Sequence, residues 1–244
     1  MSCFDQLTVF ILATNEQESL RQTVRSVVEA CGAKTLHEIV AVLPSDQCPA
    51  AKICGEFGDN ACGVPFHPYY QKKPDKIRFF SEIPPLTSSS HFVIMAGDME
   101  MDPFSLGAMI KLAKEKPDAI VCGAKWVKGS QVFGYGFLHR LANMAVNRCA
   151  ALLLHSNGKE LFSIFEIYPK AVFDRMRFNP AIPLLFEYTL LPVSQGVEYI
   201  EIPTVYHKRT EGASNSNLWV YLLMGARFIL TAGKLALRKP KQIH

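Results

Sequence analysis

The sequence has little of what marks disulfide-rich, zinc-binding or secreted proteins. Its seven cysteines are an odd number, and no two of them have the C-x-x-C spacing of a metal or redox site. A zinc centre or a disulfide framework is therefore not expected. We expect reduced, mostly buried thiols in a reducing compartment.

Long apolar runs and basic tracts are also missing. The first sixteen residues lack the basic flank and long apolar core of a signal peptide, and they read better as a buried strand. The apolar stretch from Leu218 to Arg238 is interrupted by Arg227 and Lys234, whereas a spanning helix needs about 20 uninterrupted apolar residues. No Lys/Arg block is interleaved with aromatic residues, so no nucleic-acid partner is predicted. These absences predict a cytoplasmic protein.

What is present suits a folded enzyme. The chain has 244 residues, of which 49% are hydrophobic and 20% charged, enough to bury a large core without covalent staples. The formal net charge of +4 is compatible with a protein that handles phosphates.

Apolar runs and helical spacing alternate along the first half of the chain. Residues 9–13 and 38–43 read as strands, and residues 16–30 and 50–57 as helices. This order predicts an α/β fold with a mostly parallel central sheet and right-handed crossovers. Further strands are expected at 91–96, 119–122, 162–167 and 197–202, and further helices at 104–114, 137–154, 171–176 and 184–193. The proline-rich stretch 65–85 is expected to be an irregular loop.

The C-terminal segment is expected to differ from the rest. We divide the chain into an α/β domain over residues 1–217 and an amphipathic, basic helix or tail over residues 218–244. This helix could lie on the anionic inner face of a membrane. It could equally pack on the domain or in a homodimer interface, and the sequence does not decide between these interpretations.

Polar side chains follow three of the predicted strands. They are Asn15 and Glu16, Asp46, and the pair Asp98 and Glu100. In open α/β sheets ligands bind beyond the carboxyl ends of the strands, so these loops should converge on one cleft. Asp98 and Glu100 alternate and could face one way from an extended loop.

Two carboxylates at this spacing suit Mg²⁺ or Mn²⁺, which would stabilise a leaving diphosphate as a Lewis acid. Read on spacing alone, the same residues are more typical of an acidic turn in which Asp102 caps the next helix.

Several segments, in order, resemble one family. VFILATNEQESL resembles its "VVIPTYNEEENL" strand and helix, and IMAGDMEMDP falls on "LDADLQHPP". ELFSIFEIYPKAV resembles "DPTSGFRLYRREV", and Arg209-Thr-Glu-Gly212-Ala-Ser214 resembles the closing "R..G.S". The chain thus resembles the inverting GT-A glycosyltransferases, within them the dolichol-phosphate or polyprenyl-phosphate mannosyltransferase-like branch. This resemblance implies a GT-A (nucleotide-diphospho-sugar transferase) fold, with helices flanking the central sheet.

The resemblance also implies residue roles. Asp98 and Glu100 would bind the metal, and Glu160 would lie near the acceptor and act as a base if the acceptor is a hydroxyl. Arg209 would contact the donor phosphate, as suits a bidentate guanidinium. The remaining nucleotide-binding positions would be Asn15, Glu16, Gly212 and Ser214, and Asp46 could substitute, from a shifted position, for the family's Asp that recognises the base. Each has a plainer interpretation: Asn15 and Glu16 could cap the first helix, Glu160 could be a surface acid, and Arg209 could belong to a solvated basic loop, His207-Lys208-Arg209.

The sequence also departs from the family pattern. Ala96 replaces the first Asp of the D-x-D motif, the Asp that recognises the base is missing, and Glu166 stands where the family has a basic residue. The expected function is metal-assisted, inverting sugar transfer from a nucleotide-diphospho-sugar to a polyprenyl-phosphate or glycan acceptor. The alternative is a catalytically degenerate GT-A-like protein that binds a nucleotide or a partner. A nucleotidyltransferase is disfavoured because no Gly-rich loop with Lys or Arg follows the first strand.

Overall fold

The apolar runs of the N-terminal half form parallel strands joined by helices. The computed structural model describes residues 3–72, 84–178, 184–209 and 218–237. β1 (Leu7–Leu12) lies between β2 (Leu36–Leu43) and β5 (His91–Ala96) and is parallel to both. The crossovers contain α1 (Glu18–Cys31) and α2 (Pro49–Phe57), and α3 (Ser105–Glu115) follows β5.

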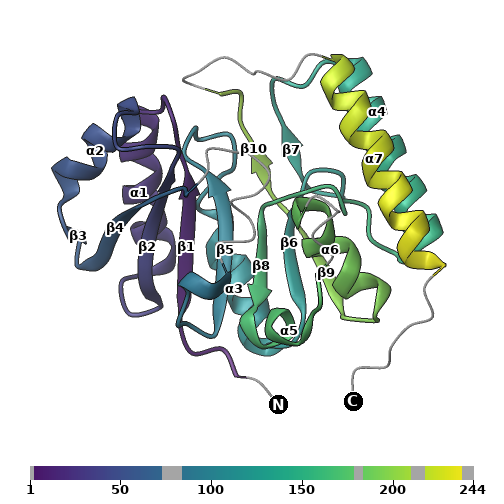
Figure 1. Cartoon of the computed structure of the whole chain (residues 1–244), viewed down its shortest axis with the longest axis horizontal. Coiled ribbons are helices and arrows are strands. Elements are labelled where there is room, and N and C mark those ends of the chain that lie inside the picture. Colours follow the sequence, from purple (N-terminus) through teal and green to yellow (C-terminus); the bar gives the residue numbers. More distant parts are fainter. Residues whose placement is uncertain (1–2, 73–83, 179–183, 210–217, 238–244) are drawn as a thin grey trace.

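One sheet of eight strands runs through the described part of the chain, in the order β3-β4-β2-β1-β5-β8-β6-β9 (Figure 1). Only β3 and β8 run antiparallel to their neighbours, so the predicted mostly parallel sheet is confirmed. β7 and β10 form a separate parallel pair. The remaining elements are β3 (Asn60–Ala61), β4 (Val64–Tyr70), η2 (Pro84–Leu86), β6 (Ile120–Ala124), β7 (Gln131–Val132), α4 (Phe137–Leu153), β8 (Glu166–Pro169), α5 (Lys170–Arg175), α6 (Leu184–Ser194), β9 (Tyr199–Pro203), β10 (Val205–Tyr206) and α7 (Leu218–Ala236).

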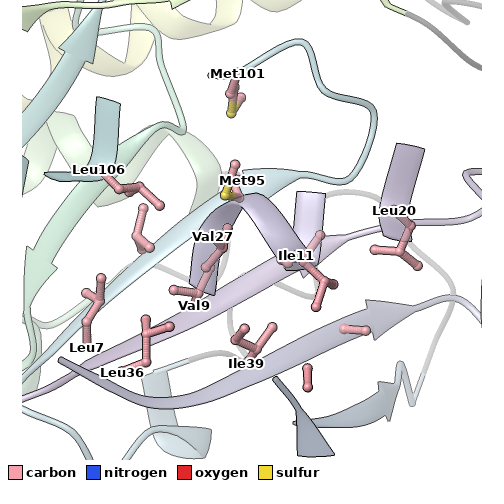
Figure 2. Close-up of a cluster of buried hydrophobic side chains, with 14 of the residues drawn as sticks. Leu7, Val9, Ile11, Leu20, Val27, Leu36, Ile39, Met95, Met101 and Leu106 are labelled. Carbon is pink, nitrogen blue, oxygen red and sulfur yellow. The ribbon is translucent and has the colours of Figure 1, made fainter. Parts of the chain in front are cut away.

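β1 is buried on both faces, as its continuous apolar run predicts. Leu7, Val9 and Ile11 pack into a cluster that contains Val27 of α1 (Figure 2). Phe10 points to the opposite face and meets Phe92 edge-on at 6.2 Å between ring centroids. This double burial fixes the position of the loops that follow β1 and its neighbours.

The proline-rich stretch is not wholly irregular, contrary to the prediction. Its first residues belong to β4, which pairs in parallel with β2 from Ile39 to Leu43. β3 pairs only with Val64 and Pro65 of β4. In the part of the chain that the structure describes, the rest of β4 is therefore an edge of the sheet on its outer side. Pro68 lacks an N–H but can lie on such an edge without breaking a ladder. Residues 73–83 of the predicted loop lie outside the described residues.

The strand expected over residues 162–167 was placed too early. The Asn147 side chain accepts the N–H of Phe162 at 2.7 Å, and the Ser163 hydroxyl accepts the N–H of Phe165 at 3.2 Å. These bonds bend the segment, and β8 begins only at Glu166.

The cysteine prediction holds only in part. All seven thiols are free, but only Cys54 and Cys122 are buried. Cys3, Cys62 and Cys149 are exposed, so the expectation of mostly buried thiols was wrong. Apolar burial is supplied by the aliphatic and aromatic side chains instead.

α7 lies along α4 at one side of the molecule and also contacts α6 (Figure 1). Phe228, Ala232 and Leu235 of α7 are buried in a cluster with Val146 and Ala150 of α4. α7 thus packs on the domain, which is one of the two interpretations that the sequence left open. The proposed domain boundary at residue 217 falls outside the described residues and stays a prediction. No helix in the described part has the length and apolar character needed to cross a bilayer.

Candidate functional site

The carboxyl ends of β1, β2 and β5 lie at one edge of the sheet because the three strands are parallel neighbours. The loop after β5 contributes Asp98 and Glu100, and the loop after β1 contributes Glu16. Glu16 is close enough to raise the pKa of Asp98, although burial and nearer groups have larger effects. The structure therefore brings these two predicted loops together.

The two carboxylates of the loop after β5 converge through a tight turn. Met99 has φ of 58°, in the left-handed region that few non-glycine residues adopt. The N–H of Glu100 donates to Asp98 Oδ1 at 3.0 Å. The predicted extended loop was therefore wrong, but the predicted convergence of the side chains is what the turn produces.

Arg209 bridges this pair. Its Nε lies 3.0 Å from Asp98 Oδ2 and 3.0 Å from Glu100 Oε2. The backbone holds Arg209 there, because the N–H of His207 donates to the carbonyl of Glu100 at 2.8 Å. The basic segment after β10, residues 207–209, is thus part of the site. Arg209 lies between the two carboxylates, in the space that a metal cation would take.

The site carries more negative than positive charge. Asp98 is 2% exposed, and burial raises the pKa of its carboxyl. The N–H of Glu100 and the Arg209 guanidinium lower that pKa, while Glu100 and Glu16 raise it. Three carboxylates face one guanidinium, which favours a further cation.

The donor set fits Mg²⁺ or Mn²⁺ better than zinc. Asp98 and Glu100 offer only oxygen ligands, and no cluster of three or more His, Cys, Asp or Glu able to hold a metal occurs in the described part of the chain. Mg²⁺ commonly binds one or two carboxylates and takes its other ligands from phosphates and water. The pair therefore matches a metal that arrives with a phosphate ligand.

A cavity of about 510 Å³ adjoins the acidic pair. Tyr135, in the loop between β7 and α4, donates its hydroxyl to Glu100 Oε1 at 2.9 Å. The cavity has one acidic lining residue and several basic ones, so it suits an anion. Its lining consists of Glu100, Phe133, Gly134, Tyr135, Gly136, His139, His207, Lys208, Arg209 and Tyr221.

A buried ion pair lies near enough to Tyr135 to affect the pKa of its hydroxyl. Lys125 Nζ is 2.6 Å from Glu160 Oε1, and the backbone N–H of Lys125 donates to Glu160 Oε2 at 3.1 Å. Burial lowers the pKa of Lys125, but the Glu160 carboxylate outweighs it and the pKa is raised, so the ammonium persists. Glu160 is fully buried and does not line the cavity. It is no surface acid, and its role as a base stays a prediction.

The other predicted residues are more peripheral. Asn15 and Asp46 are exposed. Glu16 Oε2 accepts the N–H groups of Thr14 at 2.6 Å and Asn15 at 2.9 Å. It therefore braces its own loop, and α1 begins without a side-chain cap. Gly212 and Ser214 lie outside the described residues.

Tyr135, Lys125, His139 and Tyr221 were not anticipated. The only sequence signal was at Tyr135, which glycines bracket on both sides. Gly134 has φ of 81°, and an added Cβ would lie 3.0 Å from the Lys208 side chain. Such a glycine marks a close approach of two segments. Here the loop before α4 meets the basic segment.

No protein-family model matches the chain. Solved structures of glucosyl-3-phosphoglycerate synthase from Mycobacterium tuberculosis are similar. Its complex with Mg²⁺ and UDP has a TM-score of 0.68 at 12% identity, covering 97% of this chain and 81% of the synthase. Its complex with Mn²⁺, UDP and phosphoglyceric acid gives 0.67 at 12%, covering 97% and 80%. The complex with Mn²⁺, UDP-glucose and phosphoglyceric acid gives 0.65 at 12%, covering 97% and 82%.

The fold is a GT-A glycosyltransferase fold. At 12% identity the likeness establishes the architecture. The mannosyltransferase-like branch stays a prediction.

Proposed function

We propose that this protein transfers a sugar from a nucleotide-diphospho-sugar to an anionic acceptor. The observation that carries the proposal is the Asp98–Glu100 pair bridged by Arg209, at the carboxyl edge of β5 in a GT-A fold. This arrangement offers carboxylates for a divalent metal and a guanidinium for a diphosphate.

The cofactor would be Mg²⁺ or Mn²⁺, held by Asp98 and Glu100, and it would supply Lewis-acid stabilisation of the leaving diphosphate. Arg209 would release the carboxylates and pair with the diphosphate. The complexes of the similar synthase with Mg²⁺ or Mn²⁺ and UDP support this assignment.

The nucleotide would bind over the loops after β1 and β2. Asn15, Glu16 and Asp46 lie on these loops, and Gly212 and Ser214 would complete the phosphate side. The sugar would then face the cavity that Tyr135 and Arg209 share.

The cavity favours an acceptor that already carries its nucleophile as an anion. Its basic lining suits a phosphate, and Glu160 is buried in an ion pair and poorly placed to deprotonate a hydroxyl. A polyprenyl phosphate needs no strong base and would attack in one inverting displacement. A glycan hydroxyl would instead need a base, for which the lining offers His139 or His207. A lipid acceptor would place the protein peripherally at a membrane.

Donor binding tests the proposal. Thermal shift with GDP-, UDP- and CDP-sugars, with and without Mn²⁺, should show stabilisation that needs both the metal and Asp98. Asp98→Ala should abolish the shift, while Asp59→Ala, at an exposed position on another edge, should keep it. No response to any donor would refute the proposal.

A second candidate is a degenerate GT-A protein that binds without turnover. Two observations favour it. Ala96 stands at a position where the resembled family has a metal ligand, and Arg209 already forms ion pairs with Asp98 and Glu100. Metal-dependent donor binding without sugar release to polyprenyl phosphate or to glycans would identify this case.

A further inference from the structure

The exposed apolar side chains are concentrated on one pair of helices. Of fourteen large hydrophobic residues that are exposed in the described part of the chain, nine lie on α4 or α7 and a tenth, Leu237, directly follows α7. They are Phe137, Leu138, Leu141, Met144, Leu152, Leu153, Leu222, Leu223, Leu230 and Leu237. Exposed apolar side chains concentrated on two neighbouring helices indicate an interaction site.

These residues are not a loosely packed core. The inner faces of the two helices are already buried against each other, and α7 also packs against α6, through Val146, Phe228 and Leu235. Gly225 allows the close approach, since a Cβ there would lie 2.7 Å from Val146 Cγ2. The exposed residues therefore belong to the outward faces of a well-packed pair.

Helical spacing gathers leucines and basic residues into one stripe on each helix. On α4 the stripe is Leu138, Leu141, Ala145, Arg148 and Leu152. On α7 and the residue after it, the stripe is Leu223, Arg227, Leu230, Lys234 and Leu237. The six leucines are 55–89% exposed.

The charge on this surface has one sign. Neither helix contains an Asp or a Glu, whereas Arg148, Arg227 and Lys234 are exposed within the stripes. The sequence continues after α7 with the basic residues Arg238, Lys239 and Lys241, which lie outside the described residues. Two copies packed face to face would set like charges against each other without a carboxylate to pair them, which disfavours a homodimer through this surface. An anionic lipid headgroup layer complements both features.

We propose that the outward stripes of α4 and α7 form one docking face for an anionic membrane, with leucines inserted among the headgroups and Arg148, Arg227 and Lys234 paired with lipid phosphates. This deepens the membrane location in the proposed function, because it assigns half of the contact to α4, but it does not require sugar transfer.

The face leads directly to the candidate site. His139 of α4 and Tyr221 of α7 both line the cavity, and their rings lie 4.6 Å apart. Docking through the two stripes would hold the cavity near the headgroup layer, where the phosphate of a lipid-linked acceptor lies.

Vesicle co-sedimentation of the full-length protein tests the proposal. Wild type should bind phosphatidylcholine vesicles that contain phosphatidylserine, and phosphatidylcholine alone much less. Each basic residue near an anionic surface contributes about fivefold in affinity, so Arg148→Gln/Arg227→Gln/Lys234→Gln should lose on the order of a hundredfold. The matched control, Lys34→Gln/Lys52→Gln/Lys111→Gln, removes three exposed charges elsewhere and should bind like wild type.

The apolar contribution needs its own variants. Leu138→Gln/Leu230→Gln changes one exposed leucine on each helix and should weaken binding roughly tenfold. Leu86→Gln/Phe104→Gln, at exposed positions outside α4 and α7, should not. Thermal melting checks that all variants are folded.

Three results would overturn the proposal. The first is that wild type does not bind anionic vesicles, and the second is that the control variants lose as much vesicle binding as the helix variants. The third is that wild type does not bind vesicles but self-associates in sedimentation velocity, and that Leu138→Gln/Leu230→Gln abolishes this self-association. Donor binding in solution should be unchanged in the helix variants. Failure of the membrane proposal, seen as loss of vesicle binding, can therefore be distinguished from failure of the proposed function, seen as loss of donor binding.

Discussion

Replacement of Arg209 should change metal binding and nucleotide binding in opposite directions. In the free protein its guanidinium bridges the two carboxylates that we assign to the metal, at 3.0 Å from each. A metal ion must displace it. Arg209→Gln removes the competing cation, so Mn²⁺ alone should bind more tightly. With Mn²⁺ present, UDP should bind less tightly, because its diphosphate loses the guanidinium.

The magnitude follows from the burial of the partners. Hydrogen bonds to charged groups contribute about 1.5–3 kcal/mol. The Arg209 side chain is 39% exposed, so we discount the pair of contacts for solvent screening to about 1–2 kcal/mol in total. The affinity for Mn²⁺ alone should therefore rise roughly tenfold.

Isothermal titration calorimetry with Mn²⁺, and then with UDP at saturating Mn²⁺, measures the affinity for the metal and the affinity for the nucleotide. Lys208→Gln removes the same charge from the preceding residue and leaves both contacts of Arg209 in place, so it should show no gain in Mn²⁺ affinity. Weaker binding of Mn²⁺ alone to Arg209→Gln would refute the reasoning. It would show that Arg209 organises the carboxylates for the metal instead of competing with it.

Two further predictions concern buried carboxylates. Burial raises the pKa of Glu166 from 4.5 to about 7. Between these pH values the folded state therefore keeps a proton that the unfolded state releases. The free energy of unfolding should fall by up to about 3 kcal/mol as pH rises from 4.5 to 7. Glu166→Gln should remove this slope in urea titrations and be more stable than wild type at pH 8; an unchanged slope would contradict it. Lys125→Met leaves Glu160 buried without its ammonium and should cost about 3–5 kcal/mol. The double variant Lys125→Met/Glu160→Gln should recover much of that loss, and no recovery would contradict the ion-pair explanation.

Hydroxyl groups surround the Glu166 carboxyl; burial raises its pKa, and the hydrogen bonds from Tyr199, Tyr168 and Thr189 lower it. Tyr199 Oη lies 2.6 Å from both the Glu160 carbonyl and Glu166 Oε1, but it has one hydrogen to donate. If that hydrogen goes to the carbonyl, a protonated Glu166 can donate to Tyr199 in return. Thr189 donates to the other carboxyl oxygen at 2.7 Å. The carboxyl group at the position where the resembled family has a basic residue is thus held in the core by hydroxyl groups.

The sheet and one side of the site were predictable because local signals determine them. The apolar runs of β1, β2 and β5 define parallel strands, and parallel strands place the polar residues after them at one edge. β4 was missed because prolines usually argue against a strand, and only its position at an edge makes Pro68 acceptable. The pattern of a single segment does not reveal which neighbour it will have.

The other side of the site depends on contacts between distant segments. Tyr135 meets Glu100 across 35 positions in the sequence, and Lys125 meets Glu160 across another 35. Tyr221 reaches the cavity only because α7 packs along α4. No periodicity encodes these pairs, and a family pattern gives roles to matched positions without showing which are buried. Glu160 illustrates this, since its match suggested a reactive acid and the fold encloses it in an ion pair.

The packing of α7 also connects the site to the helix surface. The hydroxyl of Tyr221 accepts a hydrogen bond from Asn143 of α4, and Asn147 of α4 both donates to Asn143 and accepts from the backbone of Phe162. These polar contacts lie on the inner faces of the helices, opposite the exposed leucines. The inner and outer faces thus belong to the same two helices, which pack against each other. A membrane contact that shifted the pair would therefore move Tyr221 and His139 in the cavity wall as well.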